Sequence, residues 1–164
     1  MAHYRGTVTT DWTPEQAFTY MADARNFAEW DPGTERSTLE QGTPGPGAVF
    51  AVQVHVGPPT ITLHYETTRH EPNRRVTLRA THPMMELVDD ISVDVVDGRT
   101  TVTYDATVTP RGVARVLGPL FDRGFAKTAE KGADGLRGRL ARPYASDEGA
   151  DGADGVDGVD GRQS

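Results

Sequence analysis

The sequence predicts an α+β domain in which an antiparallel sheet of about six to seven strands has one apolar face that a long C-terminal helix covers. Three observations support this prediction. Short segments with alternating apolar residues, separated by turns rich in glycine and proline, fill residues 34–110. Two short helical patterns follow directly after the first strand, and an amphipathic helical pattern fills residues 112–140.

The N-terminal segment predicts one strand followed by two short helices. Residues 3–10 alternate loosely, as expected of a half-buried strand. The sequence Thr13-Pro14-Glu15-Gln16 combines an N-cap threonine, a proline at the first helical position and a capping-box glutamine. A second short helix fits residues 24–30, and Asp31-Pro32-Gly33 ends it.

The middle of the chain predicts hairpin-linked strands that each have one apolar face. These strands are expected through residues 34–40, 48–56, 60–69, 76–80, 85–96 and 102–108. Their inward positions are Phe50, Val52, Val54, Val56, Ile61, Leu63, Tyr65, Val76, Leu78, Ala80, Leu87, Asp89, Ile91, Val93, Val95, Val102, Tyr104, Ala106 and Val108. His55 and His64 fall on the outward face. This alternation indicates an antiparallel sheet with one side in contact with solvent.

Residues 112–140 predict the helix that covers the apolar face. One arc of this helix contains Val113, Val116, Leu117, Leu120, Phe121 and Phe125. The dipeptide Gly118-Pro119 predicts a kink or a restart. Each helical glycine costs up to about 1 kcal/mol relative to alanine, so packing must hold this helix in place. Small residues on its inner face, Gly124, Thr128 and Gly132, leave room beneath it.

Residues 145–164 differ in composition from the rest of the chain. They contain five Asp, one Glu and one Arg in a Gly/Asp-rich repeat without aromatic residues. We expect a disordered acidic tail after a domain of residues 1–144. The net charge of the chain is −7, and the tail accounts for −5 of it (six acidic residues and one arginine). The domain itself carries only about −2, so it is near neutral and a poor candidate for nucleic-acid binding.

Several kinds of site and location are not supported by the sequence. The chain has no cysteine, and its histidines lack metal-ligand spacing, so neither a metal nor another cofactor is expected. The motifs of P-loop, dinucleotide-binding, zinc-protease and serine-hydrolase sites are missing. No segment has the length and hydropathy of a transmembrane helix or a secretory signal, so a cytoplasmic protein is expected.

Four segments resemble a known superfamily in their order and spacing. They are Thr13–Phe18 (TPEQAF), Asp23–Pro32 (DARNFAEWDP), Gly45–Phe50 (GPGAVF) and Leu117–Phe121 (LGPLF). Over roughly residues 3–142 the chain resembles the START-like, or Bet v 1-like, superfamily (SRPBCC), and most closely its bacterial polyketide cyclase/dehydrase and lipid-transport group. The resemblance implies a helix-grip fold, in which a curved sheet wraps around the last helix with a cavity between them.

The residues expected to line or cap this cavity come from the short helices, the inward strand positions and the last helix. They are Phe18, Phe27, Trp30, Phe50, Val52, Leu63, Tyr65, Leu87, Asp89, Tyr104, Leu120, Phe121, Gly124, Phe125 and Thr128. Ordinary core packing would place the same residues inside the domain. The pattern alone does not separate the two cases.

Four polar residues are weak candidates for catalysis. Asp89 interrupts an inward apolar series, where a carboxylate could act as a general base or orient a ligand. The alternative is a bulge that turns Asp89 or Asp90 to solvent. Tyr65 and Tyr104 could anchor ligand oxygens, or be core tyrosines. Lys131 could meet Asp89 or an acidic ligand, or extend past the helix edge into solvent.

The resemblance implies binding of lipids, sterols, polyketides or other apolar ligands, with a minority of enzymes. We therefore expect binding or carriage of a small hydrophobic ligand, lipid-like or polyketide-like, by a monomer or homodimer. A polyketide cyclase, aromatase or dehydratase acting in the same cavity is the alternative. An interaction module would need an exposed apolar patch, which the polar outward positions do not predict.

Overall fold

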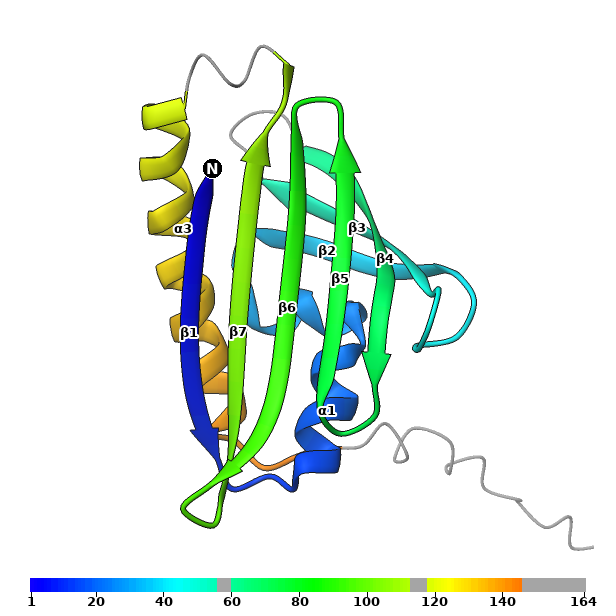
Figure 1. Cartoon of the computed structure of the whole chain (residues 1–164), viewed down its shortest axis with the longest axis vertical. Coiled ribbons are helices and arrows are strands. Elements are labelled where there is room, and N and C mark those ends of the chain that lie inside the picture. Colours follow the sequence, from blue (N-terminus) through cyan, green and yellow to red (C-terminus); the bar gives the residue numbers. More distant parts are fainter. Residues whose placement is uncertain (56–59, 113–117, 146–164) are drawn as a thin grey trace, which may run out of the picture.

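The structure, a computed structural model, describes residues 1–55, 60–112 and 118–145. For residues 118–124 and 126 it describes only the backbone, whereas the side chain of Phe125 is described. Seven strands form one curved antiparallel sheet, and the C-terminal helix lies against it (Figure 1). Within the described part of the chain, no helix combines the length and hydropathy needed to cross a bilayer.

Consecutive strands pair along the sheet, except that the first strand of the chain pairs with the last strand and not with the second. Their bounds are β1 (Ala2–Thr10), β2 (Thr34–Gln41), β3 (Val49–His55), β4 (Thr60–Glu71), β5 (Arg75–His82), β6 (Met85–Val96) and β7 (Arg99–Pro110). The order across the sheet is β1-β7-β6-β5-β4-β3-β2. The predicted α+β architecture is confirmed, and both edge strands come from the N-terminal quarter of the chain.

The helices are α1 (Pro14–Ala22), the 3₁₀ helix η1 (Ala24–Asn26), the short α2 (Phe27–Trp30) and α3 (Gly118–Leu140). The capping box predicted at the start of α1 is present. The Gln16 amide donates to Thr13 Oγ1 at 3.2 Å, and the Thr13 amide donates to Gln16 Oε1 at 3.0 Å. The second predicted helix is divided into η1 and α2. The helix predicted over residues 112–140 is found from Gly118 to Leu140, and its part at residues 113–117 lies outside the described residues.

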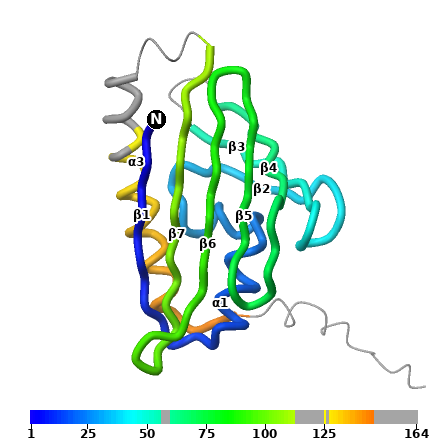
Figure 2. The backbone as a smooth tube through the Cα atoms, viewed as in Figure 1, coloured from blue at the N-terminus to red at the C-terminus, as the bar shows by residue number. Residues whose placement is uncertain are grey.

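The helices cover different parts of the sheet. Helix α1 packs against β5, β6 and β7. Helix η1 packs against β2 and β3, and α2 packs against β2. Helix α3 packs against β1 and α2. The tube view shows α3 running alongside β1 (Figure 2). Val95, predicted to face inward, is 61% exposed. It lies at the end of the β6–β7 hairpin, which extends past the described helices, so none of them covers its face of the sheet there (Figure 1).

The C-terminal end of α3 is attached to the junction between β1 and α1. Thr10 Oγ1 donates to the Leu140 carbonyl at 2.7 Å, and Trp12 Nε1 donates to the Arg142 carbonyl at 2.6 Å. The guanidinium of Arg139 lies over the rings of Trp12 and Tyr20, 4.9 and 4.7 Å from their centroids. These contacts fix one end of the helix over the sheet.

In its C-terminal half, α3 touches the end of α2 and the loop that follows it. A Cβ atom on Gly135 would lie only 1.9 Å from the Trp30 carbonyl oxygen, and one on Gly132 would lie 3.6 Å from Asp31 Oδ1. Only a glycine at position 135 allows this approach. The loop and α3 together form one wall of the space over the sheet.

Candidate functional site

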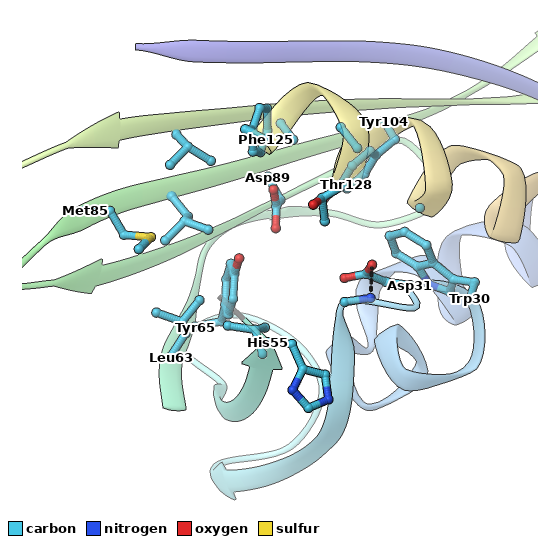
Figure 3. Close-up of a pocket in the computed structure, with 17 residues that line it drawn as sticks. Trp30, Asp31, His55, Leu63, Tyr65, Met85, Asp89, Tyr104, Phe125 and Thr128 are labelled. Atoms are coloured by element: carbon cyan, nitrogen blue, oxygen red, sulfur yellow. Dashed lines mark hydrogen bonds between the residues drawn. The ribbon is translucent and has the colours of Figure 1, made fainter. Parts of the chain in front are cut away.

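A cavity of about 340 Å³ lies between α3, the loop after α2 and strands β3, β4, β6 and β7 (Figure 3). Eight of the residues expected from the sequence line it: Trp30, Leu63, Tyr65, Leu87, Asp89, Tyr104, Phe125 and Thr128. Most of its wall is apolar. The polar groups gather where Tyr65, Asp89 and Tyr104 meet.

Four residues expected at the cavity are instead packed in the core. Phe50 and Val52 are fully buried, Phe18 stacks edge-on against His70 at 5.1 Å, and Phe27 stacks against Trp30 at 5.3 Å. For Phe50 and Val52, the strand alternation predicted the correct face of the sheet. However, α1, η1 and α2 cover that part of the face and fill the space above it. The expected lining residues Leu120, Phe121 and Gly124 have side chains outside the described residues.

Eight lining residues were not expected there: Asp31, Gly33, Val54, His55, Met85, Ala106, Val108 and Ala129. Gly132, expected on the inner face of the last helix, lines the cavity as well. The alternation already placed Val54, Ala106 and Val108 inward. Asp31 and Gly33 belong to the sequence that ends the second short helix. Only the approach of this loop to α3 brings them to the cavity.

His55 was expected to face outward and is found at the cavity rim, with its ring turned away from the interior (Figure 3). It lies 3.2 Å from Thr60 Oγ1 and 3.6 Å from Glu35. His64, which could have met it across the hairpin, pairs with Glu40 at 2.8 Å. Among the described residues, no group of three or more His, Cys, Asp or Glu side chains is placed to hold a metal ion.

Asp89 is buried, with 4% of its surface exposed, and lines the cavity. The alternative of a bulge is excluded, because β6 pairs in unbroken register with β5 and β7 on both sides of this residue. Asp89 lies opposite Leu78 and Ala106. Asp90, the next residue, therefore points to the other face, where it binds Arg75 and Thr77.

The two tyrosines act directly on Asp89. Their hydroxyl groups come from β4 and β7, and Figure 3 shows the Tyr65 hydroxyl and the Asp89 carboxylate directed into the same space. Burial raises the pKa of Asp89 to about 7; hydrogen bonding from Tyr104 and Tyr65 opposes this rise, and the charge of Asp31 adds to it. Burial also raises the pKa of both tyrosines, followed by the charge of Asp89, so both keep their protons at neutral pH.

A second carboxylate lies at the edge of the same cavity. Asp31 accepts hydrogen bonds from the Gly33 amide at 2.9 Å and from Thr34 Oγ1 at 2.8 Å. These bonds hold the loop in shape and aim the carboxylate at the cavity (Figure 3). Lys131, in contrast, is exposed on α3 and does not line the cavity. Its suggested meeting with Asp89 is not found, because the side chain is on the solvent side of the helix.

The site is thus an apolar chamber with one polar wall. That wall holds a carboxyl group whose pKa is close to neutral pH, flanked by two phenols that remain protonated. Such a group can bind a polar atom of a ligand, or take up and release a proton. The arrangement provides no nucleophile with an adjacent base among the described residues.

Comparisons with known proteins agree with this architecture. Residues 1–141 match the family model described as "Polyketide cyclase / dehydrase and lipid transport". No curated protein sequence matches the chain significantly.

Three solved structures illustrate the likeness. The Zhui aromatase/cyclase from Streptomyces sp. R1128 is 17% identical with a TM-score of 0.69, over 84% of this chain and 92% of that one. A START superfamily protein from Mycobacterium smegmatis is 15% identical with a TM-score of 0.68, over 85% and 97%. Ara h 8.0201 is 13% identical with a TM-score of 0.53, over 82% and 97%. At these identities the likeness establishes the helix-grip fold alone.

Proposed function

Because this chain belongs to the polyketide cyclase/dehydrase and lipid transport family of the START-like superfamily, we propose that it binds or carries a small, mostly hydrophobic molecule in the cavity beneath α3. The observation that carries this proposal is the cavity itself. Its volume of about 340 Å³ falls within the range of roughly 300–1,000 Å³ that is typical of small-molecule sites.

The composition of the wall supports a ligand that is apolar over most of its surface. Leu63, Leu87, Val108 and Phe125 contribute side chains from three strands and from α3. Protein cores are normally packed without voids larger than a water molecule. An apolar space of this size therefore represents a part of the core that a ligand completes.

A neutral hydrophobic fluorophore, N-phenyl-1-naphthylamine, tests this proposal. We expect saturable binding at about one molecule per chain, with a rise in melting temperature as the fluorophore concentration increases. Gly132→Phe places a ring at the cavity wall and should abolish binding. Gly138→Phe is the matched control, since a Cβ atom there meets nothing within 4 Å.

Two results would contradict the proposal. The first is fluorophore binding that occurs only on heating, which indicates a cavity inaccessible in the native state. The second is equal binding by the two phenylalanine variants, which indicates a surface site. If Gly132→Phe does not fold, Ala129→Phe tests the same wall from a half-exposed position on α3.

A second candidate function is acid–base catalysis on a ligand in the same cavity, as a cyclase, aromatase or dehydratase would need. One observation favours it: Asp89 combines full burial at the cavity wall with a pKa of about 7. A group with this pKa can both accept and donate a proton at neutral pH. Turnover of a polyketide-like substrate with an inflection near pH 7 that is lost in Asp89→Asn would support this function. Binding of the same substrate without turnover would support carriage.

A further inference from the structure

The polar groups of the cavity wall act mainly as hydrogen-bond acceptors. Asp89 lines the cavity, and an ionised carboxylate accepts hydrogen bonds but donates none. Asp31, which already accepts two hydrogen bonds, is an acceptor as well. The wall therefore matches a ligand group that donates several hydrogen bonds.

The charges around the cavity have one sign. Asp89 and Asp31 both line it, and the charge of Asp31 raises the pKa of Asp89. The lining residues within the described part of the chain include no lysine or arginine. Lys127 and Lys131 of α3 are exposed, and His55 at the rim lies against Glu35 and Thr60.

The described elements that face Asp89 across the cavity provide no lysine or arginine to compensate its charge. Strands β4 and β7 contribute Tyr65 and Tyr104, the loop after α2 contributes Asp31, and α3 contributes Phe125 and Thr128. None of these side chains is cationic. A buried carboxylate without a positive partner is costly, so a cation entering this space would stabilise its charged form.

Aromatic rings line the cavity beside these two carboxyl groups. Trp30 and Tyr104 stand nearly perpendicular, with their ring centroids 5.4 Å apart, and both line the cavity together with Tyr65 and Phe125. Ring faces attract cations. Carboxylates beside aromatic faces form the combination that recognises an ammonium group.

We propose that the ligand of this cavity is an apolar amine whose protonated amino group lies against Asp89 and Asp31, with its hydrocarbon part against the apolar wall. This inference rests on the proposed binding function and names the chemical class of the ligand. An ammonium group supplies hydrogen-bond donors to these two carboxylates, and it brings a positive charge to a described lining that has no lysine or arginine. An alcohol supplies one donor and no charge, and a carboxylate is repelled.

The pH dependence of binding distinguishes the three head groups. A primary alkylamine has a pKa of about 10, like the side chain of lysine, and stays charged between pH 6 and 8. The pKa of Asp89 is about 7, so the charge of this residue changes over the same interval. Amine binding therefore strengthens as the pH rises from 6 to 8, whereas alcohol binding does not.

Three probes with one carbon skeleton test the inference: 4-phenylbutylamine, 4-phenylbutan-1-ol and 4-phenylbutyrate. Titration calorimetry on the full chain at pH 8 should show the amine binding about tenfold to a hundredfold more tightly than the alcohol, the range of a charge-assisted hydrogen bond. The carboxylate should bind most weakly. At pH 6 the preference for the amine should shrink.

Asp89→Asn should remove most of the preference for the amine and leave the alcohol affinity within a few-fold of the native value. Asp90→Asn is the matched control, because it removes a neighbouring carboxylate that faces Arg75 on the other side of the sheet. It should keep the preference. If Asp89→Asn does not fold, Asp31→Asn tests the second carboxylate with the same readout.

The outcomes separate this inference from the proposed function. If the alcohol or the carboxylate binds the native protein as tightly as the amine does, the ammonium assignment is overturned while the cavity function stands. An unchanged preference in Asp89→Asn also overturns it. If none of the three probes binds and the fluorophore does not bind either, the proposed function itself fails.

Discussion

Asp89 and Asp90 are consecutive residues of β6, and their carboxyl groups have opposite environments. Strand alternation sends Asp89 into the cavity and Asp90 to the outer face, where Arg75 and Thr77 bind it. Burial raises the pKa of Asp89, whereas the hydrogen bond from Arg75 lowers the pKa of Asp90. The two residues therefore contribute to stability with opposite dependence on pH.

For Asp89 we predict a stability that falls as the pH rises. The folded chain holds this proton up to about pH 7, while an unperturbed aspartate loses it near pH 3.8, so folding binds a proton in between. Asp89→Asn should therefore be more stable than the native chain at pH 8, with a gain that is a few kcal/mol smaller at pH 5, since each pKa unit corresponds to about 1.4 kcal/mol. Urea denaturation at the two pH values measures this.

Asp90→Asn provides the contrasting case. In the native chain the pKa of Asp90 is lowered, so its ionised form stabilises the fold at pH values above the ordinary pKa of an aspartate. This contribution disappears as the pH falls through the lowered pKa. The variant should be less stable than the native chain at neutral pH, and this loss should shrink in acid. A loss that does not depend on pH would contradict the ion pair with Arg75 as its cause.

At the scale of elements, the packing of α3 against its neighbours depends on where its glycines lie. Gly135 allows the helix to touch the Trp30 carbonyl, whereas Gly138 faces open space. The sequence predicted that these glycines weaken an isolated helix. It did not distinguish the one that packing requires from the one that packing does not use.

The two glycines should therefore respond oppositely to alanine. Gly138→Ala should stabilise the domain by up to about 1 kcal/mol through helix propensity. Gly135→Ala should destabilise it by about 1–3 kcal/mol, as overpacking does, because its Cβ atom would clash with the backbone of Trp30. Thermal unfolding of both variants measures the difference. Stabilisation of both would show that α3 can move away from the loop without cost.

The same elements show how far the sequence could predict the site. Period-two alternation placed Leu63, Tyr65, Asp89 and Tyr104 on the correct face, because that pattern is local. It did not show that Phe50 lies under the short helices and outside the cavity, because the position of a covering helix is a tertiary property. Asp31 was missed for a related reason: a loop that ends one helix becomes a cavity wall only when a distant helix packs on it.

At the scale of the whole molecule, the sheet, α1 and α2 form the packed part of the core, and α3 spans the part that stays open. One end of α3 is held by Thr10 and Trp12. Predictions of a cytoplasmic location and of a monomer or homodimer follow from the sequence and stay predictions.

The C-terminal segment gives a prediction for the complete chain. The Gly/Asp-rich composition of residues 145–164 offers no large apolar side chains to pack on a domain. Deleting these residues should leave the melting temperature within about a degree or two of the native value. Calorimetry of both chains measures this, and a loss of several degrees would show that the segment contributes to the fold.

The placement of the two tryptophans makes the fluorescence of Trp30 sensitive to what the cavity holds. Trp12 is buried at the attached end of α3, where its indole N–H donates to Arg142 and Arg139 lies over its ring. Trp30 lines the cavity, and its indole N–H has no hydrogen-bond partner among the described residues. In a Trp12→Phe chain all indole emission comes from Trp30. An apolar guest beside that ring lowers the local polarity and shifts the emission to shorter wavelengths, so the fluorescence of the protein itself reports whether the chamber is occupied.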